Sequence, residues 1–471
     1  MDTTLSSYVY LVATVLFILG IKGLCKVRSA RNGNRMAALG MLLAIAAALY
    51  AGDVLSPTWI AGGLAAGAII GVLLASKVPF TSMPELVAAF NGFGGVASVF
   101  VALAALVKEG AKLSAEQTLV TGSAGMAVAI TLPITILIGT ATFTGSAIAY
   151  LKLSGKKLTH PVGGAARQAL NVVLAAAVIF GSVWLVGYSG SETMLTPVVV
   201  VISVAAVLGV LLVLPIGGAD MPVVVALLNS YSGIAAAASG FVISNPLLMV
   251  VGALVGASGL ILTKIMCKAM NRSLANVLLG GIGDDAQAED ARDYQSIKET
   301  SPEEVAMLFD AARNVIMVPG YGLAVAQAQH TMRELGELIE KRGTTVRYAI
   351  HPVAGRMPGH MNVLLAEADV PYDKLFELEK INSDFKSTDV VVIVGANDVV
   401  NPAAREDPQS PIAGMPILDV DEAQTVIVIK RSLSPGYAGI KNPLFDKDNC
   451  LMCFMDAKQA LEGMVTEVND L

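Results

Sequence analysis

A glycine-rich turn in the last third of the chain has the residue types and spacing of a dinucleotide-binding loop. It reads Gly320-Tyr-Gly-Leu-Ala-Val325, between a short apolar run and a helical pattern, with Val325 in the usual place of a third glycine. The first two glycines allow a tight turn and close approach of the backbone to a pyrophosphate, and the following helix supplies N–H donors. The pattern predicts a dinucleotide site, with wider helix–strand packing at Val325.

The ends of two other predicted strands indicate which dinucleotide this is. An NAD site has a carboxylate after its second strand for the ribose 2′-hydroxyl, but here Ile350 is followed by His351 and Pro352. Lys430-Arg431-Ser432 follows the last strand and suits a 2′-phosphate. A solvated strand end would also carry Lys430 and Arg431, and this alternative stays open. The pattern favours NADP(H).

More turn-rich segments follow the predicted strands, at the edge where α/β proteins bind ligands. They are Val353–Pro358, Gly395–Val399, Gly414-Met415 and the stretch from Lys430 to Tyr437. We expect Tyr437 to close over the nucleotide. The length of the loop from Asn401 to Pro416 indicates a function of its own.

Alternating strand and helix patterns position these turns. Strands are predicted at Val315–Val318, Thr345–Ile350, Val390–Val394 and Val426–Lys430, and helices at about Leu323–Lys341, Tyr372–Ile381 and from Asp456. Strands alternating with helices are typical of a doubly wound, Rossmann-like α/β domain.

The first part of the chain is of another kind. The chain is 54% hydrophobic and 15% charged, whereas soluble proteins have about 25% charged residues. Residues 1–272 hold 15 Lys and Arg and 7 Asp and Glu, a net charge of +8, and the rest hold 17 and 31, a net charge of −14. We predict a polytopic all-α membrane domain over 1–272, an acidic linker or hinge over 273–300, and a soluble NADP-binding domain over 301–471.

About nine apolar runs are long enough to span a bilayer, although the second is short. They are 5–24, 36–51, 57–76, 84–107, 124–151, 168–187, 195–214, 222–241 and 246–266. Glycines recur within them at helical spacing, as in Gly62–Gly71, Gly92–Gly95 and Gly252–Gly256, and predict close helix packing. Cations concentrate in alternate loops, which predicts an N-terminus outside and a C-terminal half in the cytoplasm.

A few polar residues fall within or at the ends of these runs, where transport function is the default hypothesis. Asn91 and Asn229 lie inside predicted spans, and either could instead form a hydrogen bond that only holds helices together. Asp220 precedes Met221-Pro222 and could simply cap its helix. Glu85 follows Pro84, and we read it as a first-turn acid that matches the helix dipole.

The four cysteines do not form a disulfide framework. Cys450 and Cys453 have the spacing of a redox motif but stand alone, and we expect Cys25, Cys267 and this pair to be free thiols. The N-terminal apolar run lacks a basic leader and a cleavage site, so we read it as a span rather than a signal peptide.

Long strings of this sequence resemble the β subunit of the nicotinamide nucleotide transhydrogenase family, nearly end to end. In the membrane half these are Ala-Asp220-Met-Pro-Val, Leu-Asn229-Ser-Tyr-Ser-Gly233 and Met266–Arg272. In the soluble half they are residues 320–329, 350–368, 395–404, 411–416 and 430–439.

The resemblance implies a Si/Re-specific transhydrogenase that passes hydride between NAD(H) on a partner α subunit and NADP(H) held here, normally making NADPH. It implies coupling to proton translocation, no metal and no flavin. It also implies a multi-pass protein of the bacterial cytoplasmic (inner) membrane, a homodimer of α–β units in contact with lipid, and no nucleic-acid partner.

The family's functional residues are carried over only at matching positions. Asp398, Asp220, Asn229 and Asn91 are implied in catalysis or coupling, and Asp398 would link protonation to the redox state of the nucleotide. The implied cofactor-binding residues are Gly320, Tyr321, Gly322, Ala324, Val325, Val353, Ala354, Gly355, Arg356, Met357, Pro358, Gly395, Ala396, Asn397, Asp398, Val399, Gly414, Met415, Lys430, Arg431, Ser432, Gly436, Tyr437, Asp456 and Ala457.

One departure from the family concerns proton movement. Some members carry a histidine where this chain has Asn91, and an amide cannot titrate. None of the four histidines falls within a predicted span. We therefore expect a helix of the partner α subunit to supply the titrating group, with Asn91 and Asn229 ordering water beside it.

An alternative function is an NADPH-sensing transporter or channel without hydride exchange. A complete single-chain enzyme is excluded, because only one nucleotide-binding pattern is present and no flavin or metal-ligand cluster offers another hydride carrier.

Overall fold

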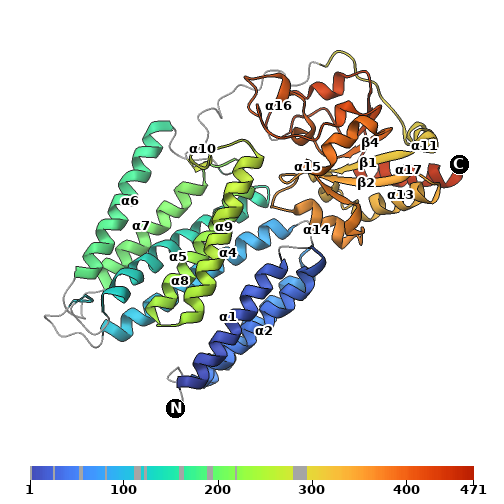
Figure 1. Ribbon diagram of the computed structural model, residues 1–471. Coiled ribbons are helices and arrows are strands. Elements are labelled where there is room, and N and C mark those ends of the chain that lie inside the picture. The colour runs from blue at the N-terminus through green and yellow to red at the C-terminus, as the bar shows by residue number, and fades with distance from the viewer. Residues whose placement is uncertain are drawn as a thin grey trace. The chain divides into compact units, whose positions relative to one another are not determined.

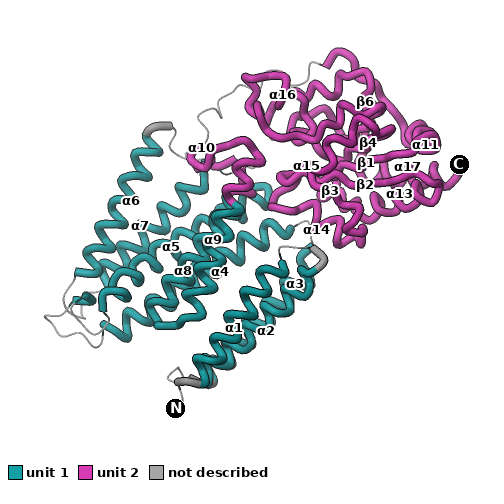
Figure 2. The backbone as a smooth tube through the Cα atoms, in the orientation of Figure 1, with its two compact units in different colours: residues 1–215, 224–262 teal, residues 216–223, 263–471 magenta. Residues whose placement is uncertain are grey.

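The computed structural model describes residues 3–24, 27–51, 57–79, 82–110, 118–120, 125–156, 158, 164–187, 195–217, 220–278, 294–436 and 438–471. The chain divides into two compact units (Figure 2). Unit 1 comprises Met1–Pro215 and Val224–Leu262, and unit 2 comprises Ile216–Val223 and Thr263–Leu471.

Nine helices among the described residues are long and apolar enough to cross a membrane, as the sequence predicts (Figure 1). They are α1 (Thr3–Leu24), α2 (Val27–Ala51), α3 (Pro57–Lys77), α4 (Met83–Gly110), α5 (Gly125–Leu153), α6 (Gly164–Gly187), α7 (Leu195–Val213), α8 (Met221–Val242) and α9 (Pro246–Ala269). The prediction for the second span was too short, because α2 begins at Val27 and has 25 residues. Its first turns contain Arg31 and Arg35, which lower hydropathy but are good helix formers.

Small residues let helices of unit 1 pack closely, as predicted for two of the three glycine groups. A Cβ added to Gly95 on α4 would lie 2.6 Å from the carbonyl oxygen of Gly139 on α5. Gly256 on α9 likewise packs against Ile234 of α8. The glycines of α3 differ, because a Cβ at Gly62, Gly63, Gly67 or Gly71 meets nothing within 4 Å in the described part of the chain.

A six-stranded parallel sheet forms the centre of unit 2, which confirms the Rossmann-like prediction. The strands are β1 (Asn314–Pro319), β2 (Thr345–Ile350), β3 (Leu375–Glu377), β4 (Val390–Val394), β5 (Thr425–Ile429) and β6 (Cys450–Cys453). Their order is β3-β2-β1-β4-β5-β6. The order reverses between β1 and β4, and ligands of doubly wound sheets bind at the carboxyl ends of the strands at this point.

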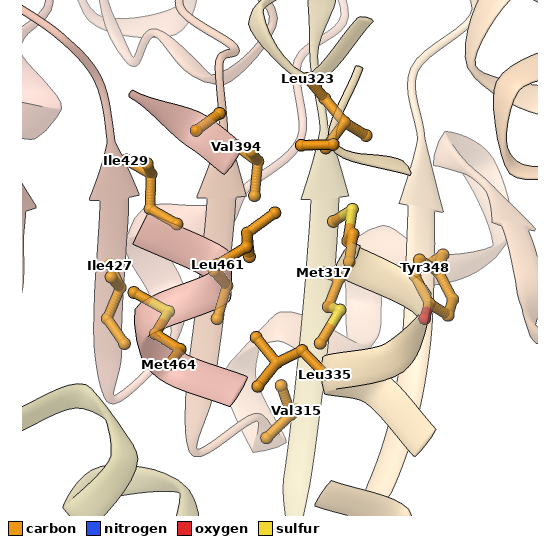
Figure 3. Packing of buried hydrophobic residues seen from close by; sticks show 14 of the residues in the cluster. Val315, Met317, Leu323, Leu335, Tyr348, Val394, Ile427, Ile429, Leu461 and Met464 are labelled. Carbon is orange, nitrogen blue, oxygen red and sulfur yellow. The ribbon is translucent and has the colours of Figure 1, made fainter. Parts of the chain in front are cut away.

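Helices cover both faces of the sheet, so alternate residues of each strand enter different cores. On one face, Met317 and Ile427 pack with residues of α13 (Gln329–Lys341) and α17 (Ala457–Asp470), as Figure 3 shows. On the other face, Ile316 and Val428 belong to a core that contains Phe385 and Phe445. Burial on both faces explains the continuous apolar runs of β1, β4 and β5, which made these strands predictable.

The predicted helix from Leu323 to Lys341 is in fact two helices. The first, α12 (Tyr321–Val325), ends where Gln327 adopts a positive φ of 51° and the Ala328 N–H donates to the Leu323 carbonyl oxygen over 3.2 Å. A left-handed residue is a common way to end a helix. No glycine or proline marks this break in the sequence.

The predicted helix over Tyr372–Ile381 was also wrong in its first half. This stretch consists of a single 3₁₀ turn, then β3, then the short helix α15 (Leu378–Ile381). The register pairs Tyr348 of β2 with Leu375 of β3. Tertiary pairing with β2 therefore overrides local helical propensity here.

Strand β6 is absent from the predicted elements and contains the two cysteines with redox-motif spacing. Cys450 and Cys453 are fully buried and belong to cores on opposite faces of the sheet, so they cannot form a disulfide with each other. Burial raises the pKa of the Cys450 thiol to about 12. These thiols and that of Cys267 are free, as predicted. Cys25 lies outside the described residues.

Two described parts of the predicted linker over 273–300 are ordered. Leu274–Leu278 forms the short helix α10, and Thr300 donates its N–H to the Met452 carbonyl oxygen over 3.0 Å. The Lys298 carbonyl oxygen accepts the Met452 N–H in turn, so this segment extends the sheet beyond β6. Residues 279–293 of the predicted linker lie outside the described residues.

Candidate functional site

A cavity of about 460 Å³ lies at the carboxyl ends of β1, β4 and β5 in unit 2. The structure brings most of the predicted nucleotide residues to it: Gly320, Tyr321, Gly322, Val325, Val353, Ala354, Gly355, Arg356, Gly395, Ala396, Asn397, Asp398, Val399, Lys430, Arg431, Ser432, Gly436, Asp456 and Ala457. These residues are separated by up to 137 positions in the sequence and meet because parallel strands end at the same edge of the sheet.

Three residues of the cavity were not predicted: Ala326, Ile429 and Met455. Each of them directly adjoins a predicted residue in the sequence. Ser434 and Pro435 also line the cavity and lie within the predicted stretch from Lys430 to Tyr437, although neither was named as a cofactor-binding residue.

Other predicted residues do not line the cavity. Ala324 is buried in the core, Met415 is buried on the other face of the sheet, and Met357, Pro358 and Gly414 are also absent from the lining. Tyr437 lies outside the described residues. Gly414 instead lies beside Asn271, whose Nδ2 donates to the Ala413 carbonyl oxygen over 2.7 Å.

The glycine turn brings two strand ends together. Gly320 donates its N–H to the Val394 carbonyl oxygen, and Gly322 donates to the Gly395 carbonyl oxygen, each over 2.9 Å. A Cβ on Gly322 would lie 2.6 Å from the Cα of Gly395, which itself adopts a φ of 69°. Val325, in contrast, is half exposed and lines the cavity, so the position of the missing third glycine does not separate helix from sheet.

Arg356 extends over the glycine turn. Its guanidinium carbon lies 4.4 Å from the ring centroid of Tyr321, a distance at which a cation is attracted to an aromatic face. Two histidines to which the sequence assigned no role, His351 and His360, accept hydrogen bonds from the backbone of the same Arg356 loop. Both lie within residues 350–368, one of the stretches that resemble the family. Nothing in their spacing distinguishes a histidine that holds a loop from one that only fills the core.

Asp398 and Lys430 also line the cavity and lie near each other. The Asp398 Oδ2 accepts the Ala438 N–H over 3.0 Å, and Gly436 packs against the same carboxylate. Lys430 donates to the Ser434 carbonyl oxygen and lies 5.1 Å from the ring centroid of Phe445. Burial lowers the pKa of Lys430 to about 8, and the Asp398 charge opposes this shift.

The N-terminus of α17 also reaches the cavity. Asp456 caps this 14-residue helix, because its Oδ1 accepts the Lys458 N–H over 3.0 Å, and Ala457 is its first residue. A helix N-terminus directs partial positive charge at an anion, although the cap satisfies part of it here.

The polar residues of the membrane half have partners of their own. In unit 1, the Asn91 Nδ2 donates to the Val225 carbonyl oxygen over 3.2 Å, and the Ser232 Oγ donates to the Asn91 carbonyl oxygen over 2.8 Å. Asn91 therefore joins α4 to α8, as one interpretation of the sequence expected. Asn229 is partly buried on α8.

Asp220 forms an ion pair that its sequence neighbourhood does not reveal. Its Oδ2 lies 2.6 Å from Nη1 of Arg272, which follows α9 at a distance of 52 positions along the chain. The Asp220 side chain is 8% exposed and that of Arg272 is 35% exposed. The pair therefore ties the start of α8 to the end of α9.

Comparison with known proteins gives the same picture over the full length. The family model described as "NAD(P) transhydrogenase beta subunit" matches residues 6–467. The chain is 50% identical over 479 aligned residues to the NAD(P) transhydrogenase subunit beta of Rhodospirillum rubrum, covering 100% of both chains, and equally similar to the protein of that name from a designated strain of the species. The chain belongs to the NAD(P) transhydrogenase beta subunit family.

Proposed function

We propose that this chain holds NADP(H) in the cavity of unit 2 and exchanges hydride with NAD(H) on the α subunit, coupled to proton translocation through its membrane helices. A beta subunit of this family implies an α-subunit partner and binding of a nicotinamide nucleotide. The proposal adds which nucleotide binds here, where it binds, and what the exchange drives.

The observation that carries the nucleotide assignment is the position of Lys430-Arg431-Ser432. These residues follow β5 and line the same cavity as the Gly320–Gly322 turn on β1. Both nucleotides need a turn for the pyrophosphate, but only NADP(H) has a 2′-phosphate for cations to bind. The cavity volume of about 460 Å³ is also within the usual range for ligand sites.

The residues fit the cofactor at three places. The glycine turn and Arg356 would hold the pyrophosphate, Lys430, Arg431 and Ser432 the 2′-phosphate, and the segment Gly395–Val399 the nicotinamide end. A bound nicotinamide supplies or accepts the hydride. The protein residues bind and orient it, and Asp398 holds the loop after β5 through its bond to the Ala438 N–H.

We further propose that Asp220, Asn229 and Asn91 belong to the proton-coupling part of the molecule. Asn91 and Asn229 offer amides that can order water, and Asp220 offers a buried carboxylate paired with Arg272. Because an amide does not titrate, a helix of the α subunit would supply the titrating group within the membrane.

The proposal extends to the setting of the enzyme. Hydride transfer is Si/Re-specific and normally makes NADPH. Residues 1–272 form the membrane domain, residues 273–300 the hinge, and residues 301–471 the nucleotide domain. The proposal places the chain in the bacterial cytoplasmic (inner) membrane, with the N-terminus outside and the nucleotide domain in the cytoplasm, as a homodimer of α–β units among lipid.

The test uses sealed vesicles that contain this chain with its α subunit. We expect NADPH to reduce an NAD analogue while the vesicle interior changes pH, and a protonophore should abolish the pH change without stopping hydride transfer. Hydride transfer with no pH change in sealed vesicles would contradict the coupling. Nucleotide-dependent proton flux without any hydride transfer would contradict the exchange.

A further inference from the structure

Two buried histidines lie directly behind the loop Val353–Pro358. His351 is 2% exposed and His360 is fully buried, and neither lines the cavity. The Nδ1 of His351 accepts the Val353 N–H over 3.2 Å, and the Nδ1 of His360 accepts the Arg356 N–H over 3.0 Å. Each ring therefore satisfies one backbone donor of a loop that borders the nucleotide cavity.

These bonds determine the protonation of both rings. A ring nitrogen that accepts an N–H bond carries no proton, so each neutral imidazole holds its proton on Nε2. The Nε2 of His351 lies 2.7 Å from the Pro416 carbonyl oxygen and donates to it. A second proton, on Nδ1, would break the bonds to the loop. In agreement with this geometry, burial lowers the pKa of both histidines to about 4, and the Arg356 charge adds to the shift of His360.

His360 also fixes the loop through its shape. Gly355 adopts a φ of 106°, and a Cβ there would lie 2.5 Å from the His360 Nδ1. The ring centroid of His360 lies 6.3 Å from that of Tyr321, and Arg356 lies over the Tyr321 ring. His360 is thus packed between the glycine turn after β1 and the loop after β2.

We propose that His351 and His360 are positioning residues, which hold the Val353–Pro358 loop through their Nδ1 atoms so that Arg356 stays over Tyr321 at the cofactor cavity. This inference rests on the proposed function, because it takes the cavity to be the NADP(H) site. It goes further by assigning nucleotide affinity to two side chains that do not line that cavity. Their effect on the cofactor passes through the loop backbone and, for His360, also through its packing beside Tyr321.

Substitution of each histidine by asparagine or by glutamine tests the roles of its two ring nitrogens separately. The Oδ1 of Asn is bonded to Cγ, as Nδ1 of His is, so His→Asn retains the acceptor for the loop. The amide of Gln is one bond longer and replaces Nε2, so His→Gln retains that nitrogen's donor and loses the acceptor. The proposal predicts that His360→Asn and His351→Asn resemble the wild type more than His360→Gln and His351→Gln do.

The experiment measures the dissociation constant of NADPH by its fluorescence, on purified complexes of the full chain with the α subunit. We expect His360→Gln and His351→Gln to weaken binding about tenfold, the order of one lost hydrogen bond, and the Asn variants to stay within about threefold of wild type. The KM for the NADP substrate should rise with kcat nearly unchanged. His330→Gln is the matched control, because its side chain is 60% exposed on α13 and it should bind as wild type does.

Different outcomes separate this inference from the function on which it rests. Wild-type complex that fails to bind NADPH would remove the proposed function itself. Normal NADPH binding by every variant, or equal loss in the Asn and Gln variants, would overturn the positioning role and leave the proposed function intact. The NAD(H) affinity of the α subunit and the thermal unfolding midpoint are measured for every variant. If a variant at one histidine fails to fold, the comparison of Asn with Gln at the other histidine tests the proposal.

Discussion

Gly322 and Gly395 meet backbone to backbone at the switch point between β1 and β4. The Gly322 N–H donates to the Gly395 carbonyl oxygen over 2.9 Å, and a Cβ on Gly322 would lie 2.6 Å from the Gly395 Cα. The contact joins the predicted pyrophosphate turn to the segment Gly395–Val399. The contact holds the two loops that border the proposed cofactor site close together.

We predict that Gly322→Ala weakens NADPH binding at least tenfold. The new methyl group requires the two turns to separate, and strain of this kind costs on the order of 1–3 kcal/mol. Fluorescence titration and the thermal unfolding midpoint report the two effects. Gly62→Ala is the control, because a Cβ there meets nothing within 4 Å, and it should leave both unchanged. Wild-type affinity in Gly322→Ala would show that the close approach is not needed.

A second prediction concerns pH and the 2′-phosphate. Because the pKa of Lys430 is lowered to about 8, its charge is present below pH 8 and is lost as pH rises through that value. NADPH affinity should therefore fall between about pH 7 and 9, and should do so less in Lys430→Arg, whose guanidinium stays charged. If NADPH affinity has the same pH profile in wild type and Lys430→Arg, the charge of Lys430 does not contribute to binding of the 2′-phosphate.

A third prediction concerns stability in acid. The pKa values of His351 and His360 are lowered to about 4 in the folded protein, from about 6.5 in an unfolded chain. The unfolded chain therefore takes up protons first as pH falls, and stability that is complete above pH 6.5 is lost down to pH 4.

The difference between the folded and unfolded pKa values limits the loss of unfolding free energy in acid to about 3 kcal/mol for each histidine. Denaturant unfolding at pH 7 and pH 5 measures the loss, and His351→Asn with His360→Asn should reduce it. The exposed His330 provides the control through His330→Asn. An identical loss in the double variant and the wild type would contradict the assignment of neutral histidines.

A fourth prediction concerns the ion pair between Asp220 and Arg272. Removing Arg272 alone leaves a carboxylate that is 8% exposed without its cation, and should destabilise the complex by about 1–3 kcal/mol, the cost of an unsatisfied buried acceptor. Asp220→Asn with Arg272→Gln should lose less than the sum of the single variants, as coupled partners do. Thermal unfolding in detergent of the wild type, the two single variants and the double variant measures this coupling. Additive losses of stability would show that the pair is not coupled.

The sequence predicts a structural element wherever one physical signal is sufficient. The strands β1, β4 and β5 contain continuous apolar runs rich in Val and Ile because both faces of the sheet are buried. Residues that follow β1, β2, β4 and β5 line the cavity. The strand β6 reads Cys-Leu-Met-Cys and lacks that signal, and β3 has three residues and depends on its pairing with β2.

The remaining failures concern contacts between distant residues. Asp220 and Arg272 are 52 positions apart, and their pairing depends on how α8 and α9 pack. His351 and His360 reach the site only through backbone bonds, which a residue type does not disclose. Met415 lies in a predicted ligand loop, yet it points into the core on the other face of the sheet. Such relationships require coordinates.

The most direct test of the central proposal is the affinity of the purified full chain, without its α subunit, for NADPH and for NADH. We predict that NADPH binds at least a hundredfold more tightly, and that Arg431→Ala removes most of this preference while leaving NADH binding unchanged. About 2.7 kcal/mol of discrimination is what a charge-assisted phosphate contact can supply. Equal affinity for NADPH and NADH would contradict the assignment of this cavity to NADP(H).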